Sequence, residues 1–492
     1  MRKFYRGNIE IIKSGKYKII LNSYLQHRLI LHSHMIWLVV RYLIFALFVI
    51  AGIYCIIRRK YHLLVLLYFL SFPFQNCAAY IAITTWNPYK IISVCMFLCL
   101  VFYHKPRQQS SIIRNYGITI ISIVCFTALL GLTYLPNKLS ASGISRVISQ
   151  SFTYCLGIIP LLFMVFLSKE QLIKSLRYYE YALYTLIALG FIHFAFLKAG
   201  IPFAPIIRDF GTTNYWAIAK FGGENVDRIY GLCGEPKNMG LYVTPYVVWK
   251  IVQLFLEPSK WVKVSISLAV ALFIFFYTYS STAYIAFVAA IPLALVIVTR
   301  IRSNFIVNIG VYLFVITVLG AFWYINLGNT IKLPESQFVK SFTERSFERA
   351  ENELEDERTE VRVLRDFQNA PVVEKITGYG PGLYVYHTAG LTFGRGYNPM
   401  QSGIVLNLVD FGVLGIFALL FLLFIALSVI ARAIKQRNLT AIYFMCIGGT
   451  TFLGNCGYSM MGGCILLGML PFLGIAYWLT SDKLNADTQL LK

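Results

Sequence analysis

Long runs of apolar residues alternate with short polar connectors along most of the chain. A run of about 20 apolar residues is long enough for a helix to cross a hydrocarbon core of roughly 30 Å. The pattern predicts spans at 36–57, 63–83, 89–103, 113–135, 147–167, 180–200, 231–256, 262–278, 281–299, 304–326, 403–431, 439–456 and 461–480. The third run is short, so we expect an all-α polytopic membrane protein with about twelve crossings.

The polar connectors differ in charge, and this difference predicts their side. Six of them are basic: Arg58 to Lys60, Lys105 to Arg114, Lys169 to Arg177, Lys260 to Lys263, Arg300 to Arg302 and Arg432 to Arg437. Lys and Arg collect in cytoplasmic loops, which predicts that the remaining connectors, at 136–146, 201–230, 327–402 and 456–460, lie outside. The N-terminal 35 residues are also basic, and alternation of thirteen spans would place them outside. Either the first or the third run does not cross, or this segment breaks the charge rule.

The same pattern predicts the domain organisation. A basic N-terminal segment (1–35) precedes a first group of spans (36–326) that contains an outer loop at 201–230. A large extracytoplasmic loop (327–402), the C-terminal spans (403–480) and a cytoplasmic tail (481–492) follow. The large loop holds eleven of the 22 acidic residues and nine of the 44 basic ones. Its Glu and Arg residues recur at helical spacing, so we expect this loop to be partly helical, with a stop at Pro371.

Composition excludes several classes of protein. The chain is 58% hydrophobic and 13% charged with a net charge of +22, and the basic residues are clustered between apolar runs rather than on one nucleic-acid-binding face. The ten Cys are scattered through apolar segments without metal-ligand spacing. The basic N-terminus runs too long before the first apolar stretch for a cleavable signal peptide. We therefore expect a membrane protein that binds neither nucleic acid nor metal.

One candidate site is the segment Arg228–Gly240, where the outer loop meets the seventh span. Arg228, Glu235 and Lys237 form a costly charged cluster at a membrane boundary. The guanidinium of Arg228 suits phosphate oxygens, and Gly231 allows the backbone to approach a ligand closely. The structural alternative is that Glu235 pairs with one of the two cations and anchors the start of a helix. We interpret the segment as a substrate-binding element.

A second candidate site is the glycine-rich end of the large loop. Gly380 and Gly382 lie close together in sequence, and Arg395 stands between two further glycines. Such a loop places backbone donors and a guanidinium near an anion, although glycines alone indicate only tight turns. His387 is a candidate base, with a solvated surface histidine as the alternative.

Other polar groups are weaker candidates. Arg208 lies in the outer loop before Arg228, where an ion pair with Asp209 or Asp227 is the alternative to ligand binding. Ser280 stands in a tight polar turn between two spans, without the nearby His and Asp that nucleophilic catalysis needs. No Walker A loop and no His-rich metal set are present, so we expect no cofactor.

Residues in these segments resemble a known family. The span from Gly403 to Gly415 opens with L-x-D-x-G-x-x-G, which is similar to the pattern that follows the large loop in the O-antigen polymerase and ligase superfamily. The R-x-x-G-L-x-x-E-P run at Arg228–Pro236 resembles the outer-loop arginine element of this family, and Gly378–Gly382 resembles its G-x-G loop. The resemblance covers roughly residues 60 to 480. In the ligase branch a His stands about eleven residues before the glycine that corresponds to Gly412; here Gln401 and Ser402 occupy that region, which favours a polymerase.

The resemblance implies a GT-C-like membrane glycosyltransferase that is metal-independent and acts on glycans linked to polyprenyl (undecaprenyl) diphosphate. It implies the bacterial inner membrane as location and a product such as O-antigen, capsule or exopolysaccharide. A flippase and a chain-length regulator are the candidate protein partners. Arg228 and Arg395 are expected to clamp the diphosphate, with Arg208 as a third cation. Glu235 or Asp410 is expected to orient the acceptor hydroxyl or an arginine, with structural pairing as the alternative.

Two other functions compete with polymerisation. A ligase would transfer the finished glycan to lipid A core, and the missing His argues against it. A transporter or flippase of lipid-linked oligosaccharides would show internal repeats or several charges within spans. The sequence has no such repeat, and the large outer loop suits an active site outside the membrane core.

Overall fold

The structure is a computed structural model that describes residues 16–81, 84–102, 111–133, 141–199, 203, 218–221, 224–301, 313, 359–388, 402–457 and 469–481. Within these ranges nine helices are long and apolar enough to cross a membrane. They are α2 (Lys16–Ile57), α5 (Ser111–Thr133), α6 (Ala141–Phe163), α7 (Lys169–Lys198), α8 (Pro236–Leu256), α9 (Trp261–Tyr277), α10 (Ser281–Ile301), α17 (Gly403–Lys435) and α18 (Leu439–Gly457). The protein is therefore a helical, multi-pass membrane protein, as the sequence predicts.

Shorter elements complete the described fold. Three apolar helices of ten to fifteen residues are α3 (Tyr61–Leu70), α4 (Pro88–Phe102) and α19 (Leu470–Leu479). Two antiparallel hairpins pair β1 (Ala79–Ile81) with β2 (Thr84–Trp86), and β3 (Ile218–Phe221) with β4 (Glu224–Asp227). Single 3₁₀ turns stand at Met164–Phe166 and Pro258–Lys260. The predicted span at 304–326 lies outside the described residues apart from Leu313.

Two of the basic connectors, after α8 and after α17, meet at one end of the helix bundle. Tyr443 at the start of α18 donates a hydrogen bond to Glu257 at the end of α8 (Oη–Oε1 2.7 Å). Asn438, between α17 and α18, donates from Nδ2 to the Leu479 carbonyl at the end of α19 (3.0 Å). We name this end, where α8, α17 and α19 finish, the basic face. Its composition is what the charge rule expects of loops that share the cytoplasmic side.

The other end of the bundle collects the polar segments that the sequence predicts to lie outside. The Asn76 amide, after α3, donates to the Leu232 carbonyl before α8 (3.0 Å). The Ser402 hydroxyl at the start of α17 donates to the Cys456 carbonyl at the end of α18 (3.2 Å). We name this end, where α8 and α17 begin, the outer face. Loops that are distant in sequence thus meet there.

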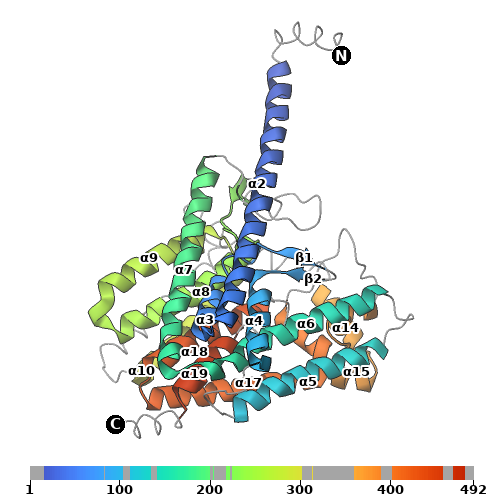
Figure 1. Cartoon of the computed structure of the whole chain (residues 1–492), viewed down its shortest axis with the longest axis vertical. Helices are drawn as coiled ribbons and strands as arrows, with labels where there is room; N and C mark the ends of the chain where they lie inside the picture. The colour runs from blue at the N-terminus through green and yellow to red at the C-terminus, as the bar shows by residue number, and fades with distance from the viewer. Residues whose placement is uncertain are drawn as a thin grey trace, which may run out of the picture.

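The helices divide into an enclosed core and an apolar periphery. Helix α8 is buried along nearly its whole length, because α7, α9, α10 and α18 pack around it. By contrast, α2, α5 and α17 expose large apolar side chains such as Ile57, Leu129 and Leu427. In water such a surface would drive association, whereas acyl chains of a bilayer cover it at no cost. Helix α2 is a single 42-residue helix whose N-terminal end rises out of the bundle (Figure 1).

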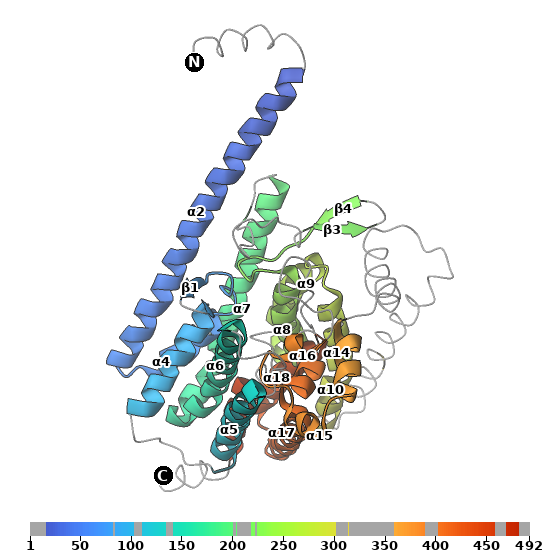
Figure 2. The same cartoon turned by 90° about the vertical axis from the view of Figure 1, so that its right-hand side faces the viewer.

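Three short helices of the large loop pack on the outer face beside α17. They are α14 (Thr359–Gln368), α15 (Val372–Thr377) and α16 (Tyr384–His387), and Figure 2 shows them next to α17. In α14, Val363 and Phe367 are buried and Val361 is exposed. Pro371 stands between α14 and α15, as a helix stop should. The acidic stretch before Thr359 lies outside the described residues.

Candidate functional site

Arg228 is held against the junction between α9 and α10. Its side chain is only 9% exposed, and its Nε donates to the Thr278 carbonyl while Nη2 donates to the Tyr279 carbonyl, both at 3.0 Å. Carbonyls at a helix C-terminus carry partial negative charge and attract a cation. Two bonds from one edge of a planar guanidinium fix its orientation. Arg228 is therefore a positioned cation at the outer face.

The backbone that follows Arg228 takes a path that only glycine adopts easily. Gly231 and Gly234 have φ of +52° and +93°, in the region that other residues avoid. His193 on α7 accepts hydrogen bonds at Nδ1 from the Tyr230 amide (3.1 Å) and the Gly231 amide (3.2 Å). The amide of Gly231, a predicted substrate-binding residue, is thus occupied by His193.

Glu235 and Lys237 stand at the first turn of α8. Glu235 is the buried N-cap residue, and Pro236 takes the first helical position. A carboxylate at this place is favoured by the positive end of the helix dipole. Lys237 is half-buried beside it. At Gly240 an added Cβ would come within 2.9 Å of Thr278 Oγ1, so the start of α8 packs tightly on the same turn that receives Arg228.

The glycine-rich loop docks on a break in α17. Gly412, inside α17, has non-helical dihedrals of φ 58° and ψ −145°. Gly378, with φ of 76° and ψ of 175°, lies so close that a Cβ on it would be 2.4 Å from the Asp410 backbone. The amides of Tyr379 and Gly380 donate to the Val409 and Asp410 carbonyls at 2.7 and 3.1 Å. These carbonyls are available to the loop because the break interrupts the helical ladder.

Asp410 anchors this loop. Its side chain has no exposure; Oδ2 accepts a hydrogen bond from the Tyr154 hydroxyl (2.7 Å), and Oδ1 accepts one from the Gly382 amide (3.0 Å). Arg146 donates from Nε to the Gly382 carbonyl (2.7 Å). Sequence reasoning offered Asp410 as an orienting group or a structural partner. The geometry is that of the structural partner, because the carboxylate is fully buried and each of its oxygens accepts a hydrogen bond from the protein.

His387 lies under the glycine-rich loop rather than at its surface. Its ring stacks on Tyr379 with centroids 4.2 Å apart, and Nδ1 is 4.0 Å from the Glu374 carboxylate, too far for a hydrogen bond. Burial lowers the pKa of His387 to about 4 and raises the pKa of Glu374. The imidazole is therefore neutral at pH 7 and a weak base in this conformation. The expectation of a solvated surface histidine is not met, since the side chain is only 9% exposed.

Two predicted cations lie outside the described residues. They are Arg208, in the loop before β3, and Arg395, in the segment between α16 and α17. Among the residues that the structure describes, no group of three or more His, Cys, Asp or Glu side chains is arranged to hold a metal ion.

Helix α18 connects the two clusters. Cys456, in its last turn, accepts the bond from Ser402 at the start of α17. Two residues earlier, a Cβ on Gly454 would lie 2.8 Å from Leu241 in the second turn of α8. Two helical residues rise only about 3 Å, so the starts of α8 and α17 flank the same end of α18. The two predicted clusters therefore share the outer face (Figure 2).

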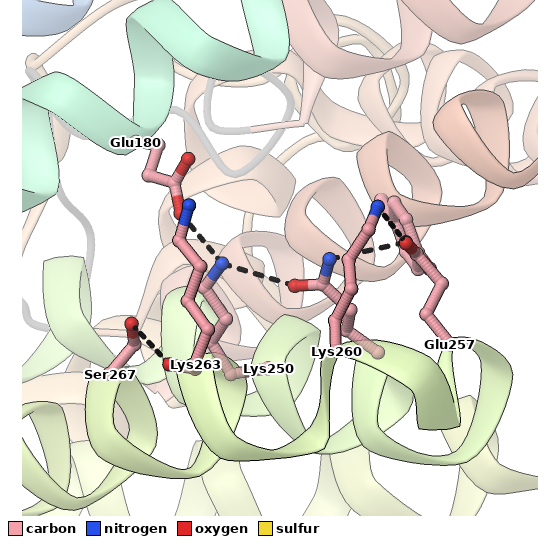
Figure 3. A network of polar contacts seen from close by, with 8 residues as sticks. Glu180, Lys250, Glu257, Lys260, Lys263 and Ser267 are labelled. Atoms are coloured by element: carbon pink, nitrogen blue, oxygen red, sulfur yellow. Dashed lines mark hydrogen bonds and ion pairs between the residues drawn. The ribbon is translucent and has the colours of Figure 1, made fainter.

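Sequence reasoning missed a charged network at the basic face. Lys250 on α8 is 4% exposed and binds Glu180 of α7 (Nζ–Oε1 2.7 Å), with its ammonium 4.1 Å from the Trp249 ring centroid. Gln253 and Glu257 continue the network toward α18, as Figure 3 shows. The signal was a Lys within the apolar stretch that follows Lys237 in the run 231–256. Lys250 is fourteen residues from the start of α8, about 21 Å along the helix, so the network holds helices together away from the outer clusters.

Comparison with known proteins identifies a domain within the chain. Residues 266–420 match the family model described as O-antigen ligase. The matched region runs from α9 through the large loop to the first half of α17, and so includes the glycine-rich loop, Asp410 and Gly412. The Arg228–Gly240 segment precedes it. No curated protein matches the chain.

Proposed function

We propose, from the match of residues 266–420 to the O-antigen ligase family model, which supports the O-antigen ligase and polymerase superfamily, that the protein is a polysaccharide polymerase. It joins polyprenyl-diphosphate-linked oligosaccharide units into a surface polysaccharide at the outer face of the bacterial inner membrane. The family consists of glycosyltransferase-like enzymes of membranes. The substrate, the polymerising activity and the inner membrane are the parts of this statement that are our proposal.

We favour a polymerase over a ligase because the sequence has no histidine near residue 401. The chain has Gln401 and Ser402 there, before the Gly412 break. Ser402 is the N-cap residue of α17. Its hydroxyl accepts a hydrogen bond from the Val405 amide and donates one to the Cys456 carbonyl. The nearest histidine, His387, is neutral and stacked under the loop. A reaction that relies on a histidine base is therefore poorly supported.

The proposed chemistry needs charge stabilisation more than proton transfer. An acceptor hydroxyl attacks the anomeric carbon, the bond from that carbon to the diphosphate oxygen breaks, and the diphosphate leaves with the bonding electrons. The hydroxyl proton passes to solvent or to the departing diphosphate. A fixed guanidinium stabilises the developing charge without reorganising. In our proposal Arg228, held against the turn between α9 and α10, supplies it; Arg395 supplies a second from the large loop, and Arg208 a third.

Four further residues have narrower proposed roles. Lys237 adds a cation at the positive end of α8, and Glu235 orients Arg228 or the acceptor hydroxyl. Gly380 and Gly382 shape the loop rather than bind substrate, because both amides already donate to Asp410.

Deletion of the gene followed by glycan profiling tests the proposal. A lost polymerase leaves surface glycan capped with a single repeat unit. Long chains stranded on polyprenyl lipid would instead indicate a ligase, and single units trapped on the cytoplasmic side would indicate a flippase. Complementation with Arg228→Ala or Arg395→Ala should give the single-unit phenotype at normal protein level. The matched control is Arg58→Ala, an exposed arginine in the basic connector between α2 and α3, which should restore full-length chains.

A further inference from the structure

We propose that Tyr154 is a positioning residue of the glycosyl-transfer reaction and acts through Asp410 on the glycine-rich loop; this inference rests on the proposed function. Tyr154 lies on α6 within an apolar run. Its side chain is buried, and its hydroxyl donates to Asp410 Oδ2 at 2.7 Å. The two residues are 256 positions apart in the chain, so the bond ties the first half of the bundle to the family domain.

The buried carboxylate of Asp410 needs hydrogen-bond donors. A carboxylate buried in a membrane helix is costly unless it is hydrogen-bonded, and Asp410 has two donors, the Tyr154 hydroxyl and the Gly382 amide. The Tyr154 ring also packs against Phe411, with centroids 5.4 Å apart. Removal of the hydroxyl takes away one of two bonds that hold the carboxylate in place. The carboxylate is then held by the Gly382 amide alone.

Both backbone polar groups of Gly382 are fixed by this arrangement. Its amide donates to Asp410 on α17, and its carbonyl accepts from Arg146, which lies eight residues before Tyr154 on α6. A Cβ on Gly382, whose φ is +73°, would come within 3.2 Å of Arg146 Nε. Helices α6 and α17 thus hold Gly382 from two sides, through the two peptide units that flank its Cα. The backbone at Gly382 cannot shift unless one of these bonds breaks.

The fixed backbone of Gly382 sets the position of the chain that follows it. Helix α16 begins two residues after Gly382, and His387 at its end stacks back on Tyr379 at the other end of the loop. The segment from 378 to 388 is therefore closed on itself and attached to α17 at Tyr379, Gly380 and Gly382 and to α6 at Gly382. Arg395, a cation of the proposed function, follows this segment by seven residues in the sequence. Small displacements of a positioned group cost large factors in rate, on the order of 100-fold for 1 Å.

Tyr154→Phe tests the inference, because it removes one hydrogen bond and keeps the ring. Two quantities are measured on purified full-length protein: amide hydrogen exchange of residues 378–388, and kcat and KM for a polyprenyl-diphosphate-linked repeat unit. We expect faster exchange and a kcat lowered by about 10- to 100-fold, with KM within about 3-fold of wild type. Asp410→Asn should have a similar effect, and the double variant should be no worse than the more severe single variant.

The control is Tyr116→Phe. Tyr116 is also buried, and its hydroxyl donates to the Ala418 carbonyl of α17 (3.2 Å), eight residues beyond Asp410 and away from the loop. This variant should leave exchange at 378–388 and kcat unchanged. If Tyr154→Phe leaves exchange or kcat unchanged, or lowers kcat only as much as Tyr116→Phe does, the inference is overturned. If the wild-type protein does not elongate the lipid-linked unit, the proposed function itself fails, and exchange alone then decides whether Tyr154 holds the loop.

Discussion

Gly378→Ala should disrupt the junction between the glycine-rich loop and α17. Gly378 has φ of 76° and ψ of 175°, a conformation that is essentially limited to glycine and costs another residue about 1–3 kcal/mol. The new Cβ would also stand 2.4 Å from the Asp410 carbonyl carbon and oxygen and the Phe411 amide nitrogen. These are backbone atoms, so they cannot rotate away, and such overpacking costs about 1–3 kcal/mol. The two effects together predict a loss of about 4 kcal/mol at this junction.

The assay is thermal unfolding in detergent, followed by the yield of long-chain glycan in cells. A loss of this size should lower the apparent melting temperature by at least about 5 °C. Gly449→Ala is the matched control, because no described atom lies within 4 Å of its Cβ inside α18. Alanine is better than glycine in a helix interior by about 0.5–1 kcal/mol, so this control should melt at the wild-type temperature or above. Equal melting of Gly378→Ala and wild type would refute the close docking of the loop on α17.

Two further substitutions test other contacts. The pKa of His387 is lowered from 6.5 to about 4, so the neutral ring contributes stability that is complete above pH 6.5 and is lost as the pH falls toward 4. At pH 5 the loss is about 2 kcal/mol. His387→Asn should therefore reduce the drop in melting temperature between pH 7 and pH 5, and an unchanged drop would contradict the assignment. Lys250→Met leaves the Glu180 carboxylate unpaired and should cost about 3 kcal/mol. Adding Glu180→Gln should restore most of the melting temperature, and no restoration would show that Lys250 stabilises by packing alone.

The sequence predicted those features that depend on neighbouring residues. Apolar runs predicted where the helices lie, and the stop at Pro371 follows from a local rule. Glycines at 231, 378, 380 and 382 indicated unusual backbone, and all four have positive φ. These signals identified both clusters on the outer face.

The roles of individual side chains could not be predicted, because they depend on contacts between distant segments. Nothing near Tyr154 in the sequence distinguishes it from other tyrosines in apolar runs, and its partner Asp410 lies 256 residues away. His387 looked like a surface residue, yet Tyr379 covers it. The partner of Lys250 is Glu180, on another helix. Patterns along one chain report which face of a helix is buried, but not what it is buried against.

The most direct test of the central claim uses purified protein in a bilayer with a polyprenyl-diphosphate-linked repeat unit as the only glycan. The measured quantities are the chain length of the lipid-linked product and the amount of polyprenyl diphosphate released. We expect the wild-type protein to make products of several repeat units and to release one polyprenyl diphosphate for each bond formed, and Arg228→Ala to leave single units. Elongation by Arg228→Ala at the wild-type rate would contradict the role of the cation. Wild-type transfer of glycan to a lipid A core acceptor, without elongation of the lipid-linked unit, would contradict the polymerase.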